Sequence, residues 1–126
     1  MKKCMGVIII LFFSLSCIFA EVIPDTEIKN VEIRYKDGKG TYYTRDIDKL
    51  DFDKIITICN ESKYDNSGTM KKVPTPDYYI TINYIDNTFI SILIWDNWEQ
   101  IKINEYWYFL GRNKIEFYNI IRKCKN

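Results

Sequence analysis

Residues 78–110 read YYITINYIDNTFISILIWDNWEQIKINEYWYFL. Apolar and polar side chains alternate from Tyr78 to Ile85, from Thr88 to Trp95 and from Trp98 to Asn104. Alternation with a period of two is typical of strands that bury one face. Two Asp-Asn pairs, which favour turns, separate these runs, and a short further strand is expected from Tyr106 to Leu110. The stretch therefore predicts an antiparallel meander.

The alternation gives the meander two faces of different composition. One face collects isoleucines and should lie under covering helices: Ile80, Ile82, Ile90, Ile92, Ile94, Ile101 and Ile103. The other face is largely polar but carries Tyr79, Phe89, Leu93, Trp95 and Trp98. Because aromatic residues are enriched in contact surfaces, these five are the candidate binding residues. The alternative is that the loop 60–76 or the N-terminal segment folds over them, and residues 106–108 would extend either arrangement.

A hairpin and a helix are expected before the meander. Residues 28–35 and 41–45 read as two strands, and Asp37-Gly38 between them is a two-residue turn signal. The helix that follows has an apolar stripe at helical spacing: Phe52, Ile55, Ile56 and Cys59. Asp51 is its expected N-cap, and Leu50 should pack on Ile55.

The C-terminal helix repeats this stripe in residue type and spacing: Phe117, Ile120, Ile121 and Cys124. Asn113 and Glu116 form a capping-box pattern at its start. The repetition fits either convergence, since helices on one sheet face need similar stripes, or an internal duplication. Together these elements predict an α+β fold with an antiparallel sheet of about five or six strands and two amphipathic helices on one face. We expect one domain over residues 28–126, preceded by a tail over residues 21–27.

The first 20 residues have the layout of a secretory signal peptide. Lys2 and Lys3 precede an apolar run from residue 5 to residue 15, and small or polar residues follow up to Ala20. The run is too short to span a bilayer comfortably. Cleavage after Ala20 would release a soluble protein, whereas use of Ser14–Cys17 as a lipobox would make Cys17 a lipidated N-terminus; an uncleaved anchor is a third outcome. The expected location is therefore extracytoplasmic: secreted, periplasmic or lipid-anchored.

Composition excludes several functions. The 126 residues include no histidine, which removes Ser-His and Cys-His catalysis and most zinc sites. Basic and acidic residues balance, at 18 against 17. After residue 20 the closest candidates for a basic patch are the short clusters at residues 71–72 and 122–125, so nucleic acid is not an expected partner. No glycine-rich phosphate loop is present, and no cofactor is expected.

An exported chain with cysteines at matching helix positions invites a disulfide between Cys59 and Cys124. The alternative is two free buried thiols. Neither thiol is a candidate nucleophile, because no histidine is available to activate it.

Two groups of carboxylates need an interpretation. Asp46, Asp48, Asp51 and Asp53 lie at the start of the first helix, where acidic residues offset the helix dipole; calcium binding is the alternative. Glu99 and Glu105 lie near strand ends and are the candidate pair for a histidine-free hydrolase.

The exported N-terminus, the hairpin-then-helix opening, the meander and the closing helix 114–123 together resemble small extracytoplasmic bacterial domains of unknown function, often lipoproteins. The resemblance implies no catalytic residue. The function expected from the sequence is a non-enzymatic envelope or secreted protein that binds another protein or an envelope component, with membrane contact only through a lipid on Cys17. A carboxylate hydrolase and a purely structural surface lipoprotein are the alternatives.

Overall fold

The computed structural model describes residues 21–68 and 72–125. The strands are β1 (Ile28–Lys36), β2 (Tyr42–Asp46), β3 (Lys63–Tyr64), β4 (Tyr78–Tyr84), β5 (Phe89–Ile94), β6 (Gln100–Ile103) and β7 (Tyr106–Phe109), and the helices are α2 (Lys49–Glu61), the 3₁₀ turn η1 (Gly111–Asn113) and α3 (Lys114–Cys124). The predicted α+β class is confirmed, but the sheet has seven strands rather than five or six. The predicted signal peptide, including Cys17, lies outside the described residues.

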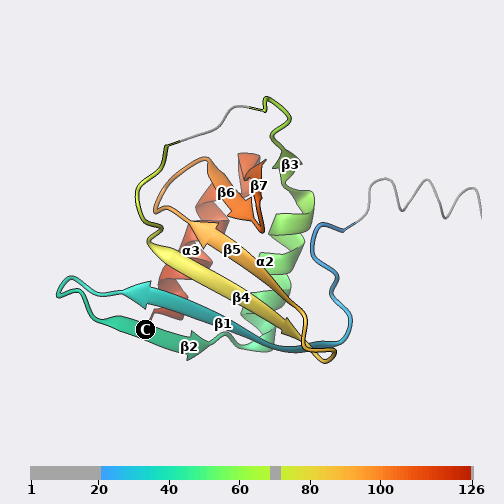
Figure 1. Ribbon diagram of the computed structural model, residues 1–126, viewed down its shortest axis with the longest axis vertical. Coiled ribbons are helices and arrows are strands. Elements are labelled where there is room, and N and C mark those ends of the chain that lie inside the picture. Colours follow the sequence, from blue (N-terminus) through green and yellow to red (C-terminus); the bar gives the residue numbers. More distant parts are fainter. Residues whose placement is uncertain (1–20, 69–71, 126) are drawn as a thin grey trace, which may run out of the picture.

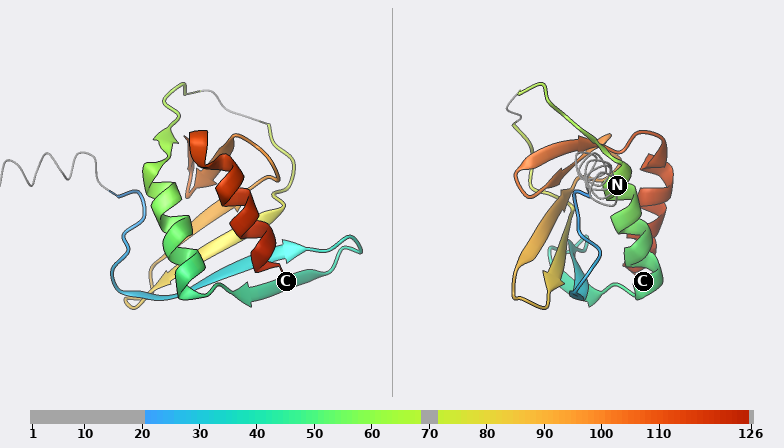
Figure 2. Two further views of the ribbon diagram at one scale, coloured as in Figure 1. Left: turned by 180° about the vertical axis from the view of Figure 1, so that it is seen from behind. Right: turned by 90° about the vertical axis from the view of Figure 1, so that its right-hand side faces the viewer.

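The seven strands form one antiparallel sheet in the order β2-β1-β4-β5-β6-β7-β3. The N-terminal hairpin joins the meander because β1 pairs with β4 over most of its length. Both α2 and α3 pack on the same face of the sheet, and neither of these two described helices covers the other face (Figures 1 and 2). None of the described helices is long and apolar enough to cross a membrane.

The additional strand, β3, lies in the segment predicted as the loop 60–76. Its two residues, Lys63 and Tyr64, pair with Phe109 and Tyr108 of β7 and so place this segment at the far edge of the sheet. A two-residue strand carries no detectable alternation, which is why the sequence pattern did not predict it.

The isoleucine face is the core, as the alternation predicts. Six of the seven isoleucines expected there are fully or almost fully buried, and Ile90 is partly buried against them. Phe117 and Ile121 of α3 and Ile55 of α2 cover this face and are themselves buried. The three turns of the meander each use an asparagine with positive φ, at Asn87, Asn97 and Asn104, a conformation that asparagine tolerates better than most residues.

Three predictions about local geometry in the first half of the domain are wrong. The connection between β1 and β2 spans residues 37–41 rather than two residues, and Gly40 adopts a φ of 88° in it. Helix α2 begins earlier than expected, with Asp48 as its N-cap accepting from the Asp51 backbone N–H at 2.9 Å. Leu50 does not pack on Ile55, because its side chain is 67% exposed.

The capping box predicted for the last helix is also absent. The side chain of Asn113 makes no capping hydrogen bond, because the 3₁₀ turn η1 leads directly into α3. The Asn113 Nδ2 instead donates to Glu61 Oε1 at 3.3 Å, at the C-terminal end of α2. The pair therefore shows that the start of α3 lies beside the end of α2.

The predicted disulfide does not form: Cys59 and Cys124 are both free thiols. The two helices are antiparallel, since Lys123 at the end of α3 contacts Asp51 at the start of α2 at 2.9 Å. Both cysteines occupy the C-terminal end of their own helix, so antiparallel packing places them at opposite ends of the pair. Asp51 and Cys59 are already about 12 Å apart along α2, beyond the reach of a disulfide.

The segment predicted as an N-terminal tail packs against the domain. Ile23 is fully buried, and the Asn60 side chain both accepts from the Ile23 N–H at 2.7 Å and donates to the Ile23 carbonyl at 3.0 Å. The Tyr84 hydroxyl donates to the Pro24 carbonyl at 2.7 Å. This segment therefore contributes to the core and to the end of β4.

Candidate functional site

The sheet surface turned away from the helices is the candidate site. We define its uncovered part, on β1, β4 and β5, as the open face; its side chains are those of Asn30, Glu32, Arg34, Tyr79, Thr81, Asn83, Phe89, Ser91 and Leu93. In Figure 1 this side of the sheet lies in front of the two helices. All three strands lie inside the sheet, although β2 pairs with β1 only from Glu32 to Lys36 and β6 pairs with β5 only at Ile92 and Leu93.

Tyr79 and Leu93 form the apolar centre of the open face. They are direct cross-strand partners between β4 and β5, and both side chains are partly exposed. Arg34 of β1 lies opposite Tyr79 on its other side, so the three side chains form one row across the sheet. Phe89 belongs to the same face but lies toward the β4–β5 turn, opposite Asn83, with its ring 63% exposed.

Trp95 is not part of an exposed surface, and this part of the binding-face prediction is wrong. Its side chain is 2% exposed and lies between Trp98, at 5.3 Å between ring centroids, and Trp107, at 5.0 Å. Its indole Nε1 donates to the Pro74 carbonyl at 2.7 Å. Trp98 stays partly exposed at the rim of this stack.

The segment between β3 and β4 explains the burial of Trp95. Pro74 holds the indole of Trp95, and the Asp65 carboxylate accepts from Gln100 Nε2 at 2.7 Å on the neighbouring strand. The alternative that the loop 60–76 covers the aromatic face therefore holds at the β6–β7 end. It does not hold at β1, β4 and β5, where Tyr79, Phe89 and Leu93 remain accessible.

Two cations that the sequence analysis did not single out lie on or beside the open face. The Arg34 guanidinium lies 4.3 Å from the Tyr42 ring centroid, and the Lys102 ammonium lies 5.8 Å from the Trp107 ring centroid. Within residues 21–68 and 72–125, neither cation is in an ion pair with a carboxylate. These positions could be found only from the pairing of β1 with β4 and of β6 with β7, which alternation alone does not specify.

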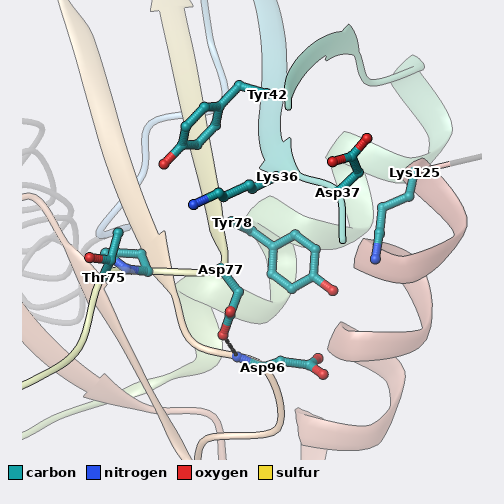
Figure 3. Close-up of a pocket in the computed structure, with 9 residues that line it drawn as sticks. Lys36, Asp37, Tyr42, Thr75, Asp77, Tyr78, Asp96 and Lys125 are labelled. Atoms are coloured by element: carbon teal, nitrogen blue, oxygen red, sulfur yellow. Dashed lines mark hydrogen bonds between the residues drawn. The ribbon is translucent and has the colours of Figure 1, made fainter. Parts of the chain in front are cut away.

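A hollow of about 500 Å³ opens where the β1–β2 hairpin approaches the C-terminal end of the chain (Figure 3). Its lining includes Lys36, Tyr42, Tyr78 and Lys125, together with three aspartates. In Figure 3 the carboxylate of Asp77 accepts a hydrogen bond from the backbone N–H of Asp96, at 2.8 Å.

The aspartates of this hollow are engaged in holding the structure together. Asp96 pairs with Arg122 at 3.2 Å. Asp37 accepts from the backbone N–H groups of Thr41 and Lys39, and these bonds, that of Thr41 foremost, lower the pKa of Asp37. A lowered pKa keeps this carboxylate ionised, which is the opposite of what a general acid near neutral pH requires. The hollow therefore has the character of a polar contact surface.

Glu99 and Glu105, the candidate carboxylates of a hydrolase, flank β6 at its two ends. Glu99 is also bound by Lys114 at 2.9 Å.

Three of the four aspartates around the start of α2 have side-chain partners in the protein. Asp48 caps the helix, Asp51 accepts from Lys123, and Asp53 pairs with Lys49 at 3.0 Å. No group of three or more acidic or thiol ligands that could hold a metal ion occurs among the described residues.

Comparison with protein-family models, with curated proteins and with solved structures finds no match to this chain. The resemblance to small extracytoplasmic domains therefore stays a prediction.

Proposed function

We propose that this chain is an exported, non-enzymatic binding module that uses its open face to hold another protein or an envelope component. The observation that carries the proposal is the row Arg34–Tyr79–Leu93, in which two partly exposed apolar side chains lie beside a cation that has no carboxylate partner among the described residues, on the sheet face opposite α2 and α3. Rows of this kind combine burial of apolar area with a charged group that sets orientation.

The rigidity of the face supports a role in recognition. Tyr79 and Leu93 project from central strands whose opposite side is packed against the buried isoleucines. Side chains on such strands lose little freedom when a partner docks, which lowers the entropic cost of binding. Of the two candidate carboxylates of a hydrolase, Glu99 is held by Lys114 at 2.9 Å and lies at the opposite end of β6 from Glu105, which favours binding over the alternative of catalysis.

The test is capture of partners from an envelope extract by the immobilised protein. The double variant Tyr79→Ala/Leu93→Ala should lose at least about tenfold in captured material, because truncation of central contact residues commonly costs more than 1 kcal/mol each. The matched control is Leu50→Ala/Ile115→Ala, which removes two apolar side chains that are 67% and 77% exposed on the helices. Equal capture by both double variants would refute the proposal.

Export itself is tested by mass spectrometry of the N-terminus. Cleavage after Ala20 predicts a chain starting at Glu21, and lipidation predicts an acylated Cys17. Recovery of the protein from the cytosol with Met1 still attached would contradict the proposed location.

A further inference from the structure

A second hollow, of about 490 Å³, lies on the open face beside the β4–β5 turn. Every residue that lines it carries a polar group: Lys29, Asn30, Glu32, Asn83, Tyr84, Asn87 and Thr88. At its centre one carboxylate oxygen, Glu32 Oε1, accepts from Asn30 Nδ2 at 3.2 Å and from Asn83 Nδ2 at 3.0 Å. Side chains from two neighbouring strands are thus fixed against each other before any ligand arrives.

The network leaves hydrogen-bonding capacity directed outward. Among the described residues, no donor occupies Glu32 Oε2 or the side-chain carbonyl oxygens of Asn30 and Asn83. Each asparagine also retains a second N–H on its amide nitrogen. The hollow therefore offers acceptors and donors within one small, pre-organised group.

An exposed aromatic ring lies next to these polar groups. Asn30, Asn83 and Phe89 are direct partners across β1, β4 and β5, so they occupy one line across the sheet about 10 Å long. The Phe89 ring is 63% exposed and lies at the end of this line. The site thus places an apolar surface beside a set of mixed donors and acceptors.

This combination matches the chemistry of a sugar. A pyranose has hydroxyl groups that both donate and accept hydrogen bonds around its edge, and a flat C–H face that can pack on an aromatic ring. The lining carries one cation and one anion, Lys29 and Glu32, so the hollow does not select for a strongly charged ligand. The alternative occupant is an extended peptide, which could add its backbone to the short outer edges of β1 and β5 that β2 and β6 leave unpaired here, and a titration with tetraalanine tests for it.

We propose that Asn30, Glu32, Asn83 and Phe89 form a binding site for a neutral or weakly charged oligosaccharide. This proposal rests on the proposed function and names the class of envelope component that the open face holds. Glu32 accepts from sugar hydroxyls, the two asparagines fix the orientation of the carboxylate and bind further hydroxyls, and Phe89 stacks on one ring.

The test is an NMR titration of the ¹⁵N-labelled protein with three probes: maltotetraose, cellotetraose and the tetramer of N-acetylglucosamine. At least one probe should shift the side-chain amide signals of Asn30 and Asn83 and the backbone signal of Phe89 in a saturable manner below about 10 mM. Asn83→Ala and Phe89→Ala should each weaken that probe by about tenfold. The matched control is Ile85→Ala, which removes a side chain that is 65% exposed in the same turn but outside the hollow.

The outcomes separate this inference from the proposed function. If none of the three sugars moves these signals, or if tetraalanine moves them and the sugars do not, the oligosaccharide site is refuted. Capture from an envelope extract that still depends on Tyr79 and Leu93 would then leave the binding function standing. If a sugar binds at the hollow but capture from the extract does not depend on Tyr79 and Leu93, the proposed contact row is refuted and the sugar site stands.

Discussion

Replacement of Trp95 by alanine should destabilise the fold strongly. The side chain is 2% exposed, stacks between Trp98 and Trp107, and bonds to the Pro74 carbonyl. Removing a buried tryptophan costs about 3–5 kcal/mol. The lost hydrogen bond adds little, because Pro74 is exposed and water can take the place of the indole. We therefore expect a loss of about 4 kcal/mol, or roughly 15–30 °C in the midpoint of thermal unfolding.

The assay is guanidinium unfolding followed by far-UV circular dichroism, because the substitution itself changes tryptophan fluorescence. Trp98→Ala is the matched control: Trp98 belongs to the same stack but is partly exposed, so its loss should cost only about 1–2 kcal/mol. A Trp95→Ala variant within about 1 kcal/mol of wild type that also loses partner capture would refute the reasoning, since the indole would then be a contact residue and not a packed one.

Three further predictions concern the free thiols and two buried polar contacts. Burial raises the pKa of Cys59 to about 12 and that of Cys124 to about 11. The thiols of the unfolded chain therefore ionise at lower pH than those of the folded protein, so the free energy of unfolding should fall as pH rises above about 9. In urea unfolding at alkaline pH, the free energy of unfolding of Cys59→Ala/Cys124→Ala should fall less steeply with pH than that of the wild type, and equal slopes would contradict this. Asp51→Ala should cost about 1–3 kcal/mol in urea unfolding, because the buried Asp51 carboxylate of α2 pairs with Lys123 of α3. Asp53→Ala, the control, should cost less than about 1 kcal/mol because its ion pair is exposed, and equal losses would contradict the packing. Asn60→Ala should cost about 1–2 kcal/mol and hasten proteolysis of residues 21–27, and an unchanged cleavage rate would show that this segment is not anchored there.

Alternation and turn residues were sufficient to predict the meander and its buried face. Alternate residues of a strand lie on opposite faces of the sheet, so either the isoleucines or the polar residues of β4 can face the core. Burial of apolar side chains favours the first arrangement, and Ile80 and Ile82 are buried. The asparagine turns followed from the same local chemistry. These features depend on neighbours in sequence, which is why one sequence is enough to find them.

Features that depend on tertiary contacts were not predictable in this way. The cover over Trp95 comes from Pro74, which lies 21 residues earlier and has no sequence signal of its own. The disulfide prediction failed because the two helices are antiparallel, which separates Cys59 from Cys124. The apolar stripe of a helix does not show in which direction that helix runs relative to its neighbour. The Asn30–Glu32–Asn83 network arises only because β1 pairs with β4 in one register.

Site-specific photocrosslinking tests the open face most directly. A benzoylphenylalanine placed at Leu93 lies in the middle of the open face, and the same group at Ile115 lies on a helix on the opposite side of the sheet. Irradiation in an envelope extract should give adducts from position 93 and none above background from position 115. Adducts from position 115 alone, or equal yields from both positions, would contradict the assignment of binding to this face.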